Sequence, residues 1–252
     1  MTLLVYGLMR PGDCPDDLEV DSHGGTTSVR CVAGDEIAAL VADAGAGPVR
    51  VRRETLMAHS DVLQRAVEHG PVLPMRFGVA LADEEAVRRE LLEPNGARLA
   101  ARLEALDGCA ELQVKATFDQ ERVLKALMAS DRTLAAMAAR VRASPGPAGH
   151  FDRIRLGELI AEAIEARASA ATEAVVGALQ PLALSVSVGA RQHEWMALNV
   201  AFLIDRARRK DFDARVDRLS ADYGGELQFR LIGPMPPHSF AEYEWEAGAT
   251  WA

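Results

Sequence analysis

The chain has 252 residues, 49% of them apolar and 26% charged, and its formal net charge is −9. This length allows one large domain or two ordinary ones, with enough apolar side chains to bury a real core. An acidic balance disfavours the phosphate contacts of nucleic-acid binding and adhesion to anionic membranes, and no apolar run reaches the ~18 residues of a membrane span.

The cysteines and the N-terminus bear on the cellular compartment. Cys14, Cys31 and Cys109 are widely spaced, odd in number and form no C-x-x-C pair, so neither a disulfide framework nor a structural zinc site is expected. The chain starts without the basic region and small-residue cleavage site of a signal peptide. We therefore expect a cytoplasmic protein without a metal or other cofactor.

Residues 1–107 are predicted to form an irregular α+β domain. A buried strand is expected at 2–8, followed by an acidic, turn-rich stretch, and Asp107-Gly108 marks the predicted junction with a second domain. The periodicity of the apolar residues predicts one more strand, at about 26–33, and helices at about 35–43, 54–69 and 83–93. Pro94-Asn95-Gly96 is expected to break the last of these, and another helix follows to about 106.

Residues 109–252 are predicted to form the second domain. Strict alternation over 111–118 predicts a half-buried strand that places Glu111 on its polar face. The elements that follow are helices at about 120–142 and 152–179, strands at 182–188 and 196–204, a helix at 209–221 and a strand at 227–231. This order fits a ferredoxin-like α/β sandwich with an extra helix in its first crossover, so the predicted fold class is α+β in two domains.

Two short segments mix proline, glycine, methionine and phenylalanine: Val72-Leu-Pro-Met-Arg-Phe-Gly78 and Gly233-Pro-Met-Pro-Pro-His-Ser-Phe240. Neither a helix nor a central strand tolerates such a block, because proline removes amide donors and fixes the backbone. We call them the 72–78 segment and the 233–240 segment. Both are expected to hold a shaped surface or a domain junction.

Each segment has a structural and a partner-binding interpretation. In the 72–78 segment, Met75 and Phe77 would fill the core and Gly78 would permit the exit, while Arg76 needs a carboxylate or the surface. The 233–240 segment would be stiff and extended, and it would either dock back through Phe240, Tyr243 and Trp245 or present them to a partner. The candidate partner-binding residues are Met75, Arg76, Phe77, Pro236, Pro237 and Phe240.

With these segments, the opening strand Leu3-Leu-Val-Tyr-Gly7 and the stretch Asn199-Val-Ala-Phe-Leu203, the chain resembles the gas vesicle protein F/L family. The resemblance does not separate the F branch from the L branch. It implies an accessory factor in gas vesicle formation and no enzyme, with no catalytic, cofactor or metal residue. It also implies a chaperone-like or nucleating adaptor whose partners are the hydrophobic major shell protein and other accessory proteins.

Two other classes of function stay open at this point. One is an enzyme whose site is assembled from dispersed residues such as His59, Arg76 and Asp61, which a deep polar pocket with strongly shifted acid–base groups would favour. The other is a nucleic-acid-binding regulator, which would need the arginines gathered into one stripe. The sequence has no P-loop, dinucleotide fingerprint, G-x-S-x-G or H-E-x-x-H motif to support an enzyme.

Overall fold

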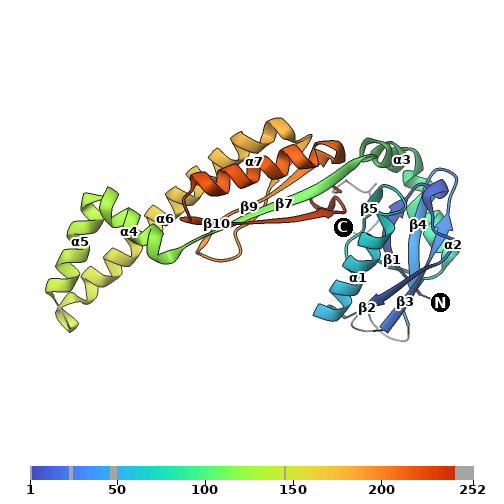
Figure 1. Ribbon diagram of the computed structural model, residues 1–252. Coiled ribbons are helices and arrows are strands. Elements are labelled where there is room, and N and C mark those ends of the chain that lie inside the picture. Colours follow the sequence, from blue (N-terminus) through green and yellow to red (C-terminus); the bar gives the residue numbers. More distant parts are fainter. Residues whose placement is uncertain (1, 23–24, 46–49, 145, 242–252) are drawn as a thin grey trace. The chain divides into compact units, whose positions relative to one another are not determined.

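The computed structural model describes residues 2–22, 25–45, 50–144 and 146–241 (Figure 1). The chain divides into two compact units: residues up to 111 together with the segment from Pro234 onward (unit 1), and residues 112–233 (unit 2). The predicted α+β class with two sheets is confirmed. The predicted domain boundary at 107–109 stays a prediction.

Unit 1 is built on a six-stranded sheet of order β2-β3-β4-β1-β5, with β6 also pairing with β1. The pairs β1–β4, β1–β5, β1–β6, β2–β3 and β3–β4 are antiparallel. Helix α1, Arg53–Ala66, packs on one face of this sheet through Val62, Leu63 and Ala66. The strands are β1 Leu3–Met9, β2 Leu18–Ser22, β3 Gly25–Ala33, β4 Ala38–Asp43, β5 Val72–Pro74 and β6 Ala80–Leu81.

A second helical stretch of unit 1 runs without interruption from Glu84 to Ala105. It starts as α2, Glu84–Ala86, passes through a π-helical stretch and a 3-10 turn at Glu93–Asn95, and ends as α3, Gly96–Ala105. The irregular middle coincides with the Pro94-Asn95-Gly96 break that the sequence predicts, because proline removes a helical hydrogen bond.

The helix predicted at 35–43 is wrong, since Ala38–Asp43 forms the central strand β4. Its residues Ala38 to Ala42 are all buried. A short apolar run of this kind fits a strand buried on both faces as well as a buried helix, and periodicity does not separate the two. The stretch expected to be acidic and turn-rich also contains a strand, β2, in which Leu18 and Val20 are buried between exposed acidic residues.

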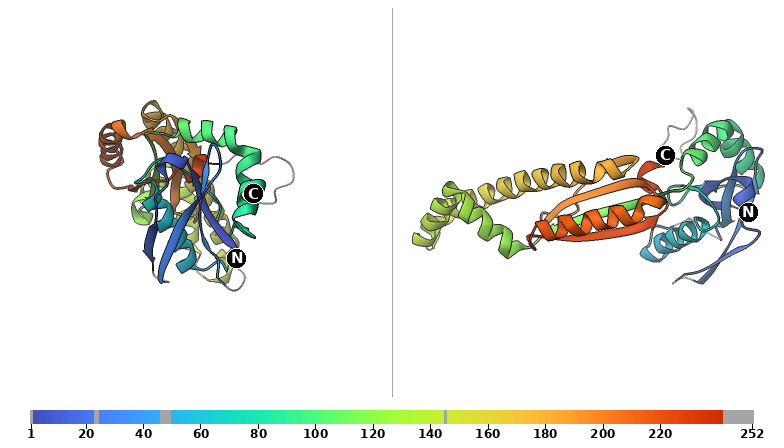
Figure 2. Two further views of the ribbon diagram at one scale, coloured as in Figure 1. Left: turned by 90° about the vertical axis from the view of Figure 1, so that its right-hand side faces the viewer. Right: turned by 45° about the horizontal axis from the view of Figure 1, so that its top comes forward.

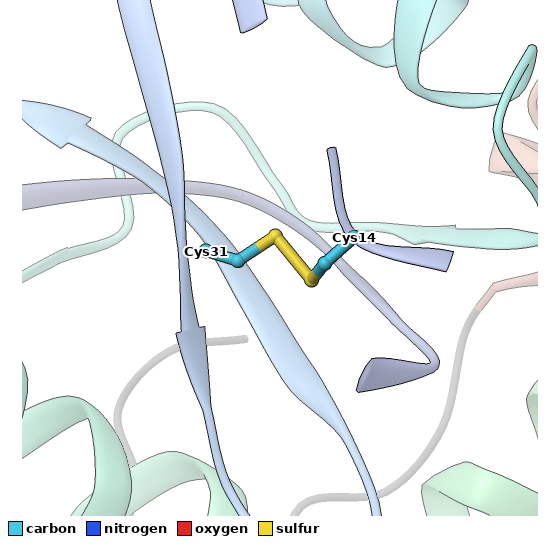
Figure 3. Close-up of a disulfide and its surroundings, with 2 residues drawn as sticks. All are labelled: Cys14 and Cys31. Carbon is cyan, nitrogen blue, oxygen red and sulfur yellow. A yellow bond between two sulfur atoms is a disulfide. The ribbon is translucent and has the colours of Figure 1, made fainter. Parts of the chain in front are cut away.

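A disulfide joins Cys14 to Cys31, which lies on β3 (Figure 3). The sequence argument against disulfides is therefore wrong for this pair. Spacing along the chain does not reveal this pair, because only the fold brings the two Cα atoms to 6.2 Å of each other. Cys109 takes no part in this disulfide.

Unit 2 carries a four-stranded sheet of order β10-β7-β9-β8. In chain order this is 4-1-3-2, the ferredoxin-like arrangement, so this prediction is confirmed. The strands are β7 Cys109–Phe118, β8 Ser185–Val188, β9 Met196–Asp205 and β10 Leu227–Met235. The helices are α4 Gln120–Ser130, α5 Arg132–Ala143, α6 His150–Leu179 and α7 Arg209–Asp222.

Helices α6 and α7 lie over one face of this sheet, and α4, α5 and the first half of α6 extend beyond its end (Figures 1 and 2). The core of unit 2 lies between the sheet and these helices, with Phe202 of β9 against Phe212 of α7 at 5.3 Å between ring centroids. The single helix predicted at 120–142 is two helices. Asp131 ends α4 and caps α5 through hydrogen bonds from the amides of Thr133 and Leu134.

Candidate partner-binding site

His59 of α1 connects the helix to the 72–78 segment in unit 1. Its side chain is only 6% exposed, and its Nε2 donates a hydrogen bond to the carbonyl oxygen of Met75 at 3.0 Å. The ring stacks on Tyr6 at 5.0 Å between centroids and meets the edge of Phe77 at 5.6 Å. His59, Tyr6, Met75 and Phe77 therefore form one packed group, which we call the His59 cluster.

The backbone of β1 explains why Tyr6 reaches this cluster. The pairing of β1 with β4 is irregular between Val5 and Gly7, and such a bulge redirects the side chain at that point. The carbonyl of Tyr6 accepts a hydrogen bond from the amide of Met75 at 2.8 Å. A Cβ on Gly7 would come within 2.9 Å of side-chain atoms of Leu63 and Val72, so only glycine allows this close approach of α1 and β5.

The 72–78 segment begins as a strand, which the sequence argument did not expect. Val72–Pro74 forms β5 at the edge of the sheet, where a proline is tolerated because its missing amide would face away from the neighbouring strand. Beyond it the chain turns, and Gly78 has φ +95°, a conformation that L side chains rarely adopt. Met75 is buried, as the sequence predicts, and Gly78 is the residue at which the chain turns out of the segment.

The electrostatics of the cluster keep His59 neutral. Burial is the main cause that lowers its pKa from 6.5 to about 4, the charge of nearby His238 lowers it further, and the bond to the Met75 carbonyl partly opposes this shift. Because Nε2 donates to a carbonyl, the other ring nitrogen is the unprotonated one. This Nδ1 is buried and has no hydrogen-bond partner in the described part of the chain.

The 233–240 segment returns to unit 1 and is held there by two polar contacts. Glu111, only 2% exposed, accepts hydrogen bonds from the amide of Ser239 at 2.8 Å and from its hydroxyl at 2.7 Å. Arg102 of α3 donates to the carbonyl of Phe240 at 2.6 Å. We call Glu111 and Arg102 the tail clamp. Burial raises the pKa of the Glu111 carboxyl, and the hydrogen bonds from Ser239 oppose this effect.

The six predicted site residues differ in exposure. Met75, Pro236, Pro237 and Phe240 are buried, whereas Phe77 is half-buried and Arg76 is exposed. Arg76 forms no ion pair with any described residue, so the carboxylate partner expected for it is not found there. Tyr243 and Trp245 lie outside the described residues.

Sequence reasoning missed several residues of this region. Leu56 and Met57 of α1 remain exposed although they are large and apolar, and Val51 just before the helix is 75% exposed. Leu56, His59 and Leu63 are spaced i, i+3, i+7, which places them on one helix face, and this signal was available in the sequence. Glu111 was assigned to the polar face of its strand. Only the fold shows that the chain end covers it.

The described residues contain no group of three or more His, Cys, Asp or Glu side chains that could hold a metal ion. Asp61, two residues after His59, lines a separate shallow pocket with Glu19, Asp21, Gln64 and Arg65. No helix in the described ranges is long and apolar enough to cross a bilayer.

The fold and the cluster define an α+β protein with one six-stranded and one ferredoxin-like sheet, and with exposed apolar side chains beside a buried histidine. The profile described as "Gas vesicle synthesis protein GvpL/GvpF" matches residues 2–242, and the chain belongs to this family. The predicted family is thereby confirmed, and the chain has an accessory role in gas vesicles.

Similar proteins agree with this assignment. Gas vesicle protein F of Streptomyces sp. (strain CB03234) is 35% identical over 96% of this chain and all of that protein. Gas vesicle protein L of the same strain is 29% identical over 94% of this chain and 91% of that protein. The crystal structure of the gas vesicle protein GvpF from Anabaena sp. PCC7120 superposes with a TM-score of 0.80 at 26% identity, covering 97% of this chain and 99% of the other.

Proposed function

We propose that this protein is a chaperone-like or nucleating adaptor that binds the hydrophobic shell protein of the gas vesicle and other accessory proteins. The observation that carries the proposal is the set of large apolar side chains that are exposed in the first turns of α1 and just before it: Val51, Leu56 and Met57. Exposed apolar groups of this kind mark binding surfaces for apolar partners when they are gathered on one side of a protein.

The physical need follows from the shell protein that the resemblance implies. A small, very hydrophobic subunit that self-associates into ribs aggregates when its apolar surface meets water before assembly. A soluble adaptor that covers this surface limits off-pathway association. The net charge of −9 on this chain favours solubility of the resulting complex.

The proposed contact surface consists of Phe77 of the His59 cluster together with Arg76, Leu56 and Met57. Arg76 and Phe77 offer a cation and an aromatic edge, and Leu56 and Met57 lie on the adjacent helix. Met75, Pro236, Pro237 and Phe240 would support this surface from below, because they are buried in unit 1. A partner would reach Pro236, Pro237 and Phe240 only after the tail clamp opens.

The same proposal assigns no catalysis to the protein and places it in the cytoplasm, associated with the vesicle. The competing enzyme hypothesis relies on His59, Arg76 and Asp61. A buried imidazole whose Nε2 is bound to a main-chain carbonyl supports packing more than acid–base chemistry. The nucleic-acid hypothesis has no support from the acidic net charge.

The test is co-expression with the major shell protein, followed by affinity capture and measurement of soluble shell protein. The wild-type chain should capture the shell protein, and the double variant Leu56→Ser/Met57→Ser should lose most of the captured amount. Phe151→Ser is the matched control, since Phe151 is 82% exposed but lies in unit 2. A folded wild-type chain that captures no shell protein would refute the proposal, and equal loss in the control would refute the assigned surface.

A further inference from the structure

The four-residue strand β8, Ser185–Val188, is an edge of the sheet of unit 2 that carries neither charge nor proline. It pairs with β9 on one side and ends the strand order β10-β7-β9-β8. Leu184 and Val188 at its two ends are 63% and 62% exposed. The sequence from Ala174 to Ala190 contains no charged residue, and proteins normally blunt such an edge with charge or proline.

Three other end strands in the described part of the protein, β10, β2 and β5, carry these protections. Strand β10 has an exposed arginine, Arg230, and a proline, Pro234. In unit 1, β2 exposes Glu19 and Asp21, and β5 ends in a proline. The apolar, neutral edge at β8 is therefore a local exception.

The register of β8 determines which of its backbone groups are available. The amide of Gly189 donates to the carbonyl of Asn199 at 2.8 Å, in line with the pairing of Val188 with Val200. Antiparallel residues alternate between bonding to the neighbour and pointing away from it. Ser187 and Ser185 thus bond toward β9, and the amides and carbonyls of Val186 and Val188 point outward.

The sequence of this edge is complementary to itself. Leu184-Ser-Val-Ser-Val188 reads apolar-Ser-apolar-Ser-apolar in both directions. When two copies run antiparallel about Val186, each Ser185 faces a Ser187, each Leu184 faces a Val188, and the two Val186 residues face each other. We propose that β8 pairs with β8 of a second copy of this chain, which joins two four-stranded sheets into one.

The bonding in this pair follows from the outward groups. The two Val186 residues exchange two amide–carbonyl bonds, and Leu184, which lies in a bend just before β8, is assigned no bond in this pair. The Leu184 amide is not used, because it already donates to Leu203 at 2.7 Å. The apolar side chains Leu184, Val186 and Val188 of both copies would then shield one another from water.

Charge supports a second copy as the occupant. Two chains of charge −9 repel each other in general, and an edge without charge is where they can meet without placing like charges together. Arg191, the first charged residue after the edge, is already in an ion pair with Glu165. A basic or acidic strand from another protein would find no counter-charge along this edge.

The register gives a sharp test by cross-linking. In the full chain with Cys109→Ser, Val186→Cys should cross-link to its own copy with a short thiol reagent, because the two residues face each other across the two-fold axis. Val188→Cys is the matched control. Its two copies would lie four residues apart along the ladder, roughly 13 Å, and should not link.

Sedimentation measures the association itself. The wild-type chain should show a dimer that dissociates on dilution, and Val188→Lys, a change at an exposed position, should be monomeric at every concentration while keeping its circular dichroism. A wild-type chain that stays monomeric, together with no link at residue 186, overturns the proposal and leaves this edge to a strand of another protein. Equal linking at 186 and 188 overturns the register.

Discussion

His59 of helix α1 is buried, stacks on an aromatic ring and donates a hydrogen bond to a main-chain carbonyl. The stack on Tyr6 and the edge contact with Phe77 give the ring an apolar environment, in which the charged form is disfavoured. Protonation would also place a cation beside His238. The residue therefore acts in the fold as a neutral polar contact, and taking up a proton would add a further free-energy cost.

Stability should consequently depend on pH between about 4 and 6.5. In this window the unfolded chain binds a proton at His59 that the folded chain does not, so stability rises with pH. The free energy of unfolding is therefore highest with respect to His59 above pH 6.5, and it decreases as the pH falls toward 4. A shift of this size corresponds to about 3 kcal/mol in the free energy of unfolding.

Urea unfolding followed by circular dichroism at several pH values measures this slope. His59→Phe keeps the aromatic contacts and should remove most of it. A smaller slope should remain, because burial also lowers the pKa of His238, with the same sign. Identical slopes in the wild type and His59→Phe would contradict this account.

At the scale of elements, long periodic segments could be predicted from the sequence and short apolar ones could not. Periodicity predicts helix α6 and the alternating strand β7. The order of these elements along the chain then predicts the spatial order of the strands in unit 2. The run 38–42 has no periodicity, since both faces of β4 are buried. Contacts between distant parts of the chain, such as those of His59 with Met75 and of Glu111 with Ser239, have no local signal at all.

The tail clamp should determine whether the 233–240 segment stays docked. Glu111→Ala removes both acceptors of Ser239 and should reduce the free energy of opening of this segment by about 1–3 kcal/mol. Hydrogen exchange of the amides at 238–241 measures the opening. Glu111→Gln is the control, because its amide oxygen still accepts from the Ser239 amide, and it should keep most of the protection. Unchanged exchange in Glu111→Ala would show that packing of Phe240 alone holds the segment.

At the scale of the whole molecule, each unit has its own hydrophobic core. The core of unit 1 includes Leu4, Leu40 and Leu63, and that of unit 2 includes Val114, Phe202 and Phe212. The disulfide Cys14–Cys31 lies entirely within unit 1. A perturbation of one core should therefore be measurable separately from the other.

Reduction of the disulfide should destabilise unit 1 and leave unit 2 unchanged. The two cysteines are 17 residues apart, and releasing a loop of this length raises the entropy of the unfolded chain by the equivalent of about 3 kcal/mol. Native-state hydrogen exchange should show faster opening in strands β1 to β4, with the rates of β7 and β9 unaltered.

Phe202→Ala should instead speed the opening of β7 and β9 and leave β1 to β4 unaltered, since it empties the centre of the core of unit 2 at a cost of about 3–5 kcal/mol. Parallel loss of protection in both units after either change would mean that they unfold together.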